Sequence, residues 1–272
     1  MAWIFGGAAE TNKELTKPEI PPISSFVPSR DSKNYTFYTL DSKRRLSGNS
    51  SSFNITIPAE KLRTATRVAV IQISIPKSYY QVASNNNTFT LREGTDTATI
   101  DLDVGNYTLR GLKNKLQTLL NTNSPNNYVY TVSTTTEPDT GKLYFSVSGN
   151  SGVQPELIFT DELYEILGFE INSTNTFIAD SLASTNIVNL NKETTLFLRS
   201  SICGNDGDNI LAPIFGADTP YSSNIIWINP DIKTFSRTLV QGEQNVSFYL
   251  TNEEGKMMDL NGLNIVATLL FF

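Results

Sequence analysis

The chain has 272 residues, 39% of them hydrophobic and 18% charged, and its 21 basic and 27 acidic residues give a formal charge of −6. This length suits one elaborated all-β domain or two small domains. The negative charge excludes nucleic-acid binding through overall charge, so any nucleic-acid contact is at most local. Because the sequence contains no histidine, the commonest general base and metal ligand are missing. We expect no enzyme, no metal and no cofactor.

Two further features concern location. The single cysteine, Cys203, excludes an internal disulfide framework and is typical of a reducing compartment. The start, MAWIFGGAAETNKEL, lacks the basic region and the apolar run of a signal peptide, and no stretch approaches the roughly 18 apolar residues of a membrane span. We therefore expect a soluble protein that is not secreted and has no membrane span.

Residues 1–34 are predicted to form an extended arm, because Pro18, Pro21, Pro22 and Pro28 disfavour regular secondary structure. The arm also carries apolar side chains that a free linker would lack. These are the expected partner-binding residues: Trp3, Ile4, Phe5, Ile20, Ile23 and Phe26. The alternative is a disordered tail.

From Tyr35 onward, short apolar or alternating runs are typical of β-strands. The predicted strands are residues 35–40, 53–57, 67–75, 87–91, 97–102, 128–133, 142–147, 156–159, 194–200, 224–228, 245–250 and 264–272. So many strands with so little helix predict an all-β sandwich or barrel. The sequence has no repeat of fixed period, which disfavours a propeller or a solenoid.

Two segments have helical spacing instead. In residues 108–121, Thr108 is the predicted N-cap, and one apolar stripe is predicted to pack on a sheet. The stripe consists of Leu109, Leu112, Leu116, Leu119 and Leu120. In residues 160–169, Thr160 is the predicted N-cap and Gly168 is expected to end the helix in a left-handed conformation.

Several clusters could carry chemistry, but each has a plainer structural interpretation. Asp161, Glu162 and Glu165 could supply a pair of catalytic carboxylates, yet acids that open a short helix are favoured by its dipole. The sequence GNDGDN at 204–209 reads as a turn rather than a calcium loop. Lys43-Arg44-Arg45 is expected in a solvated loop, with an electrostatic contact to nucleic acid or to a neighbouring protein as the alternative.

Aromatic side chains at strand spacing form one more candidate site. They are Tyr79, Tyr80, Tyr128 and Tyr130. They could build a platform for a sugar, but sheet packing is the favoured interpretation.

A longer pattern points to a family. The run RVAVIQISIPKSYYQVASNNNTFTLRE at 67–93 is followed by an alternating strand, and then Gly105-Asn106-Tyr107-Thr108 opens the leucine-striped helix. Leu167-Gly168-Phe169 follows the short helix, and the chain closes on FYLTNEEGKMMDLNGLNIVATLLFF at 248–272. In this order of signals the chain resembles the penton, or vertex, capsid proteins of virophages and Polinton-like viruses, which are single jelly-roll proteins.

The resemblance implies a single jelly-roll β-sandwich at 35–272, with the N-terminal arm at 1–34 and an insertion within about 85–200 that carries a short helix. It also implies a structural, non-enzymatic protein of the virion capsid, assembled inside the host cell. Five copies would close a vertex as a homopentamer, and the arm would dock on neighbouring major capsid proteins. The alternative is a receptor-binding or carbohydrate-binding β-sandwich of a virus or phage.

Overall fold

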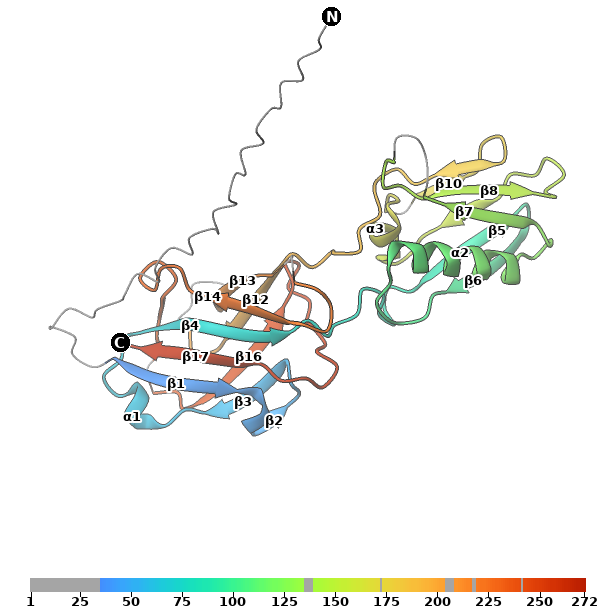
Figure 1. Ribbon diagram of the computed structural model, residues 1–272. Coiled ribbons are helices and arrows are strands. Elements are labelled where there is room, and N and C mark those ends of the chain that lie inside the picture. Colours follow the sequence, from blue (N-terminus) through green and yellow to red (C-terminus); the bar gives the residue numbers. More distant parts are fainter. Residues whose placement is uncertain (1–34, 135–138, 172, 204–207, 217–218, 241) are drawn as a thin grey trace, which may run out of the picture. The chain divides into compact units, whose positions relative to one another are not determined.

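The computed structural model describes residues 35–134, 139–171, 173–203, 208–216, 219–240 and 242–272 (Figure 1). The predicted arm at 1–34, with every residue expected to bind a partner, lies outside the described residues. Within the described part, the buried apolar side chains form two separate hydrophobic cores. Each core is enclosed by its own strands.

The first core lies between two antiparallel sheets. One sheet has the order β1-β17-β4-β14, and β15 also pairs with β4. Its strands are β1 (Thr36–Asp41), β17 (Val266–Phe271), β4 (Arg67–Pro76), β14 (Asn224–Ile228) and β15 (Arg237–Thr238). The other sheet has the order β13-β12-β16-β3-β2. Its strands are β13 (Ile210–Phe215), β12 (Thr195–Ser200), β16 (Asn245–Thr251), β3 (Ser52–Thr56) and β2 (Ser47–Gly48).

The order of these strands is that of a jelly roll. Without the two-residue strands β2 and β15, the first core has eight strands, four in each sheet. Counted along the chain, one sheet contains the first, eighth, third and sixth of them, and the other contains the fifth, fourth, seventh and second. The chain therefore crosses repeatedly between two sheets, as in a double Greek key. The predicted all-β jelly-roll class is confirmed.

Alternation of side chains explains why these segments are strands. In β14, Ile225 and Trp227 are buried in the core, whereas Ile226 and Ile228 point outward and are exposed. Strand β4 has almost no exposed positions, because it is paired on both sides by β17 and β14. A central strand of this kind is expected to be nearly continuously apolar.

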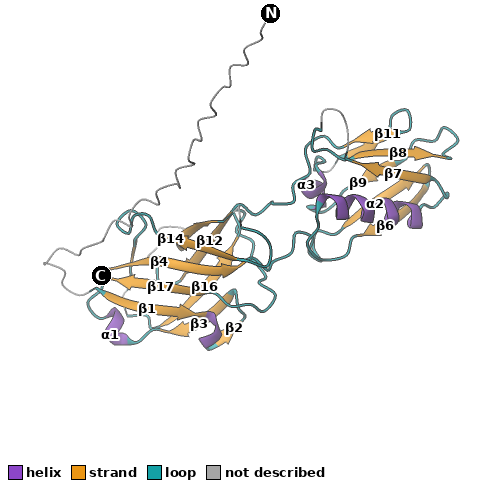
Figure 2. Cartoon of the chain, in the orientation of Figure 1, coloured by secondary structure: helices purple, strands orange, loops and turns teal. Residues whose placement is uncertain are grey.

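The second core is built from the elements between β4 and β12 (Figure 2). Its strands form two sheets, with the orders β10-β9-β5-β6 and β11-β8-β7. The strands are β5 (Thr88–Glu93), β6 (Asp96–Asp101), β7 (Val129–Ser133), β8 (Tyr144–Ser148), β9 (Glu156–Ile158), β10 (Thr174–Thr176) and β11 (Ser181–Ala183). Helices α2 (Leu109–Asn123) and α3 (Leu163–Leu167) complete it.

Helix α2 follows its prediction closely. The Thr108 hydroxyl accepts a hydrogen bond from the backbone N–H of Gly111 at 3.1 Å, so Thr108 is the N-cap. Leu112, Leu116 and Leu120 are fully buried and Leu119 packs against the second core, which confirms the apolar stripe for these four leucines, whereas Leu109 is only half-buried. At the other end, the Asn121 side chain accepts from the N–H of Tyr130 and donates to its carbonyl, both at 2.8 Å. These two bonds fix the helix to β7.

Helix α3 differs from its prediction at the N-terminus. Its N-cap is Glu162, which makes no side-chain capping bond, so the prediction of Thr160 is wrong. The reason is that Asp161 accepts from the N–H of Leu163 at 2.8 Å, which moves the start of the helix inward. Gly168 ends the helix with a φ of 77°, as predicted. A Cβ there would meet backbone atoms of Asn186 and Ile187, so only glycine fits.

Several short elements were not predicted. They are η1 (Ser42–Arg44), a 3₁₀ helix, α1 (Ala59–Leu62), β2, β10, β11, β13 and β15. Most have two to four residues, too few to show a period. Strand β13 is longer but contains Pro213. It tolerates proline because it is an edge strand, paired on one side only.

Candidate functional site

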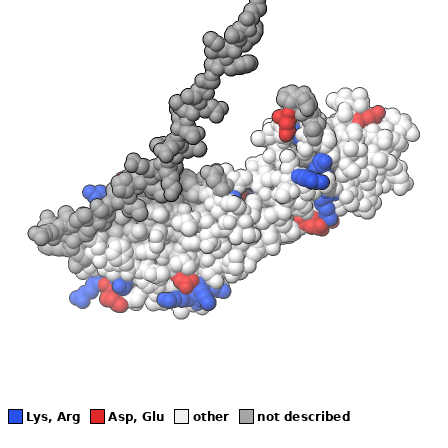
Figure 3. Space-filling model, viewed as in Figure 1, with Lys and Arg blue, Asp and Glu red and all other residues white. Residues whose placement is uncertain are grey.

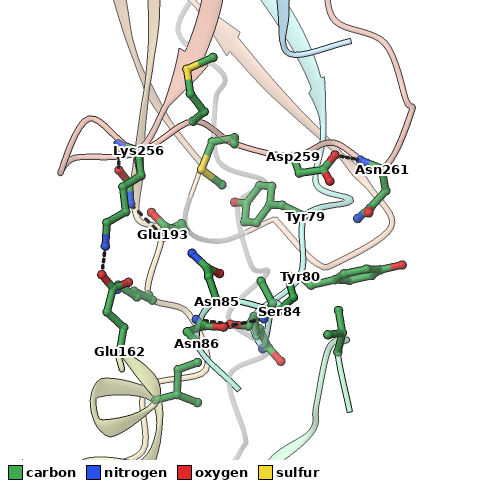
Figure 4. Close-up of a pocket in the computed structure, with 18 of the residues that line it drawn as sticks. Tyr79, Tyr80, Ser84, Asn85, Asn86, Glu162, Glu193, Lys256, Asp259 and Asn261 are labelled. Carbon is green, nitrogen blue, oxygen red and sulfur yellow. Dashed lines mark hydrogen bonds and ion pairs between the residues drawn. The ribbon is translucent and has the colours of Figure 1, made fainter. Parts of the chain in front are cut away.

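A pocket of about 400 Å³ is lined by loops that leave and re-enter the strands of the first core (Figure 4). One wall is the segment after β4, including Tyr79 and Tyr80. The segment before β12, including Lys192 and Glu193, forms a second wall. The loop between β16 and β17 also contributes, as do Glu162 and Ile166 at α3, Val104 and Tyr221. The second core is inserted at this place in the chain.

The two lysines of the pocket, Lys192 and Lys256, form ion pairs with acidic side chains. Lys192 Nζ lies 2.9 Å from Glu162 Oε2 and 2.7 Å from Glu165 Oε2. Lys256 pairs with Glu162 as well, and its Nζ lies 3.0 Å from Glu254 Oε2. Glu162 is therefore shared by two lysines from different segments. Single exposed ion pairs contribute about 0 to 1 kcal/mol, so the main effect of this network is to define the positions of the loops.

The amide side chains of the pocket also hold the chain. Gln81 donates from Nε2 to the carbonyl of Leu190 and accepts at Oε1 from the N–H of Tyr107, both at 2.5 Å. Asn252 accepts at Oδ1 from the N–H groups of Glu254 and Lys256, at 3.1 and 2.9 Å. Gln81 thus ties together three separate segments of the chain, whereas these two bonds of Asn252 hold the turn of its own loop.

A buried lysine lies beside this pocket. Lys77 is 2% exposed, and its Nζ donates to Asn191 Oδ1 at 3.0 Å. The same ammonium group lies 4.7 Å from the ring centroid of Tyr221, which compensates its charge by a cation–π interaction. Tyr79 packs edge-on against Tyr221, with ring centroids 6.2 Å apart. Burial, followed by the neighbouring Tyr221 and Glu193, raises the pKa of Tyr79 and keeps its phenol neutral.

Glu193 is the pocket carboxylate with a perturbed pKa. Burial raises this pKa, and the hydrogen bond from Asn252 at 3.3 Å and the charge of Lys192 offset the effect only in part. The folded protein therefore binds the Glu193 proton more tightly than the unfolded chain does. The ionised carboxylate lowers stability at neutral pH, and this loss is relieved as the pH falls through the raised pKa.

We therefore expect Glu193→Gln to raise the melting temperature slightly at pH 7. Glutamine keeps the oxygen that accepts from Asn252 but carries no charge to desolvate. The difference in melting temperature between the variant and the wild type should shrink as the pH falls, because the wild-type Glu193 carboxyl then becomes protonated. Thermal unfolding followed by circular dichroism at several pH values measures this. The exposed control Glu60→Gln should change little, and a lower melting temperature for Glu193→Gln at pH 7 would contradict the expectation.

The structure places the other candidates of the sequence as follows. Asp161 accepts hydrogen bonds from both the N–H and the hydroxyl of Thr88 at 3.0 Å. Its carboxylate therefore has a structural role, because it anchors the first residue of β5. Glu162 and Glu165 belong to the lysine network described above. Tyr79 and Tyr80 line the pocket, whereas Tyr130 is buried in the second core and Tyr128 packs against that core. The four tyrosines do not form one platform.

The basic cluster lies in the first turn after β1. Arg45 donates from Nη1 to the carbonyl of Ser42 at 2.9 Å and from Nε to that of Gly48 at 3.2 Å. Lys43 and Arg44 are exposed on η1. Asp206, from the suspected turn at 204–209, lies outside the described residues. In the described ranges, no group of three or more acidic or cysteine side chains is arranged to hold a metal ion.

Sequence reasoning missed the lysines of the pocket. Lys192 and Lys256 occur singly in the sequence, and Glu162, which both of them approach, lies 30 residues or more away. Lys77, beside the pocket, also occurs singly. One signal was available for Lys77, since it follows the apolar strand β4 directly and precedes Tyr79 and Tyr80. A lysine in such surroundings is expected to need a partner.

No protein-family model matches the sequence, and no curated protein matches it. Among solved structures, the chain is similar to the penton protein of mavirus, with 12% sequence identity and a TM-score of 0.49, covering 88% of this chain and 99% of that chain. The jelly-roll fold follows from the strand order of this chain alone. Of the helices that the structure describes, none has the length and apolar character needed to cross a membrane.

Proposed function

We propose that this chain is a structural capsid protein that forms pentameric vertices of an icosahedral virion. Its function is assembly rather than catalysis. The observation that carries the proposal is the eight-strand order of the first core, because jelly rolls of this kind build viral capsids. The order of sequence signals between residues 67 and 272, which resembles that of virophage pentons, favours the vertex position. The chain then acts in the virion, after assembly inside the host cell.

The contacts that the side chains of the pocket make support this proposal. Its lysines, carboxylates and amides are engaged with one another and with the backbone of the neighbouring loops. Such a network fixes the second core to the strands of the first core. A protein that assembles into a capsid needs contact surfaces that are fixed in this way. Five copies around a ring would then contact each other through different surface patches of each subunit.

Jelly rolls also occur in lectins, so a receptor-binding or carbohydrate-binding module of a virus or phage is the second candidate. The exposed Tyr80 at the rim of the pocket is the observation that favours it. Size-exclusion chromatography with light scattering distinguishes the candidates. We expect a pentamer, or a protein that becomes pentameric during particle assembly. A stable trimer, or a monomer that binds glycans, would contradict the vertex role.

The arm provides the second test of the proposal. In the vertex role, residues 1–34 dock on the adjacent major capsid protein through Trp3, Ile4, Phe5, Ile20, Ile23 and Phe26. Aromatic anchors dominate interfaces of this kind, so Trp3 and Phe5 should contribute most. Deleting residues 1–30 should leave a folded, oligomeric protein that no longer enters particles, as measured by co-expression and electron microscopy. Normal incorporation of the shortened chain would contradict this role of the arm.

A further inference from the structure

Strand β14 leaves one edge of its sheet open. It stands last in the order β1-β17-β4-β14, and among the strands that the structure describes it pairs only with β4. Ser223 and Asn229, which flank β14, are hydrogen-bonded to the β4 segment at 2.8 Å. Because bonded and non-bonded positions alternate in an antiparallel pair, the backbone N–H and carbonyl groups of Asn224, Ile226 and Ile228 point away from β4. They face the open edge.

This edge lacks the protection that edge strands of soluble proteins usually have, such as a proline, a charge or a covering segment. Edge strand β13 of the other sheet contains Pro213. Edge strand β7 of the second core is covered by α2, whose Asn121 and Gln117 side chains accept from its backbone N–H groups. Strand β14, with the sequence NIIWI, contains neither proline nor charge, and its Ile226 and Ile228 are 69% and 60% exposed. An apolar edge of this kind is expected to pair with another strand.

Strand β1 forms the opposite edge of the same sheet (Figure 1). Directly after β1, the N–H of Ser42 donates to the carbonyl of Ile265 at 3.0 Å. The same alternation then directs the backbone groups of Phe37, Thr39 and Asp41 away from β17. The Phe37 side chain is 59% exposed. On the side shown in Figure 3, charged side chains gather along the lower rim, and the described surface over β17 and β4, between the two edges, is largely free of them.

The two edges match in direction and in register. All neighbouring strands in the order β1-β17-β4-β14 are antiparallel, so β1 runs opposite to β14. When two copies lie side by side with the same face outward, β1 of one copy is therefore antiparallel to β14 of the other. Placing Thr39 opposite Ile226 brings Phe37 opposite Ile228, and every residue whose backbone groups face an open edge then has a partner. The exposed apolar side chains of both edges also meet on one face.

We propose that β14 of one copy pairs with β1 of the next copy, so that this sheet continues from subunit to subunit around the vertex. Each directly opposed pair exchanges about two backbone hydrogen bonds, and Phe37 packs against Ile228 as an aromatic and β-branched cross-strand pair. The contact joins two different edges, so it is heterologous and can close into a ring, whereas pairing of two β14 edges would stop at a dimer. The inference rests on the proposed vertex role, because it specifies the contact between the subunits of that ring.

Disulfide trapping in the full-length protein tests the proposal. A variant that carries both Thr39→Cys and Ile226→Cys is oxidised and separated on a non-reducing gel. In the proposed pairing the two Cα atoms lie about 5.5 Å apart, within the range that a disulfide spans. Within one chain, three strand spacings of about 4.8 Å each separate the two edges, which is too far. We therefore expect a ladder of cross-linked species that extends to five copies. The wild type should give none, because Cys203 is buried.

Control variants test whether the two edges themselves are needed. Each single-cysteine variant should give several-fold less cross-linked product, and so should Thr39→Cys combined with Ile178→Cys, at a position that is 77% exposed in the second core. Ile226→Lys adds the kind of charge that protects edge strands. It should shift the pentamer toward the monomer without lowering the melting temperature, whereas Ile178→Lys should leave the assembly unchanged.

The outcomes separate this inference from the vertex role. A pentamer by light scattering that gives no ladder would overturn the edge pairing and leave the vertex role intact. Equally strong cross-links from Ile226→Cys alone would show that two β14 edges pair, and would also overturn the inference. A ladder from a protein that is trimeric by light scattering would support the edge pairing and overturn the vertex role. A monomer that gives no cross-links, even after particle assembly, would overturn both.

Discussion

Replacing Glu93 by alanine should lower the free energy of unfolding by about 3 to 5 kcal/mol, the largest effect expected of any polar substitution described here. Glu93 is 1% exposed, and its carboxylate accepts three hydrogen bonds. The hydroxyls of Tyr130 and Ser124 donate to Oε1 at 2.7 Å, and the N–H of Asn126 donates to Oε2 at 2.8 Å. Alanine leaves these donors without an acceptor, and each unsatisfied donor costs about 1 to 3 kcal/mol.

Urea unfolding followed by circular dichroism measures this loss. Asp101→Ala is the matched control, since Asp101 is an exposed acid on the neighbouring strand of the same sheet. It should change the free energy of unfolding by less than about 0.5 kcal/mol. Glu93→Gln, which keeps one acceptor oxygen, should fall between the two. An effect of Glu93→Ala as small as that of the control would show that the buried carboxylate does not hold the end of α2.

The second large effect is expected from Leu116→Ala. Leu116 is fully buried in the middle of the α2 stripe, between Leu112 and Leu120. Truncating a buried leucine to alanine removes apolar contacts and leaves a cavity, which costs about 2 to 5 kcal/mol. The same urea experiment measures the change. Asn114→Ala, on the exposed side of the same helix, is the control and should be nearly neutral, because alanine favours helix. An unchanged midpoint for Leu116→Ala would mean that the stripe does not stabilise the second core.

The alternation of side chains made most of the fold predictable. Strand β12 alternates in burial along its whole length, and β16 does so from Asn245 to Leu250, because one face of each strand is buried in the core. Strand β13 was missed because Pro213 argues against a strand, and only the position at a sheet edge makes it acceptable. Strands β10 and β11 have three residues each and depend on pairing with β9 and β8. Local sequence cannot reveal such pairing.

The pocket was less predictable than the fold. Glu162 and Tyr79 stood out in the sequence, but the lysines that define their surroundings did not. Lys256 meets Glu162 only after the loop between β16 and β17 comes close to the start of α3. Contacts of this kind depend on tertiary structure, and a charged residue in a polar loop has no distinguishing pattern. The partner-binding role of Trp3, Ile4, Phe5, Ile20, Ile23 and Phe26 stays a prediction, to be tested by the experiments above.

The position of β17 has a consequence for how the chain is made. This strand lies between β1 and β4 in its sheet, yet it is the last strand of the fold to leave the ribosome. Until β17 is synthesised, β1 and β4 each have an unpaired edge where β17 will lie, and unpaired strand edges promote aggregation. The second core, with the residues packed against it, lies between residues 82 and 190 and pairs with none of the strands from β12 onward. A nascent chain can therefore carry a finished second core while its jelly roll stays open, and the arrival of Val266–Phe271 closes the sheet in one late step.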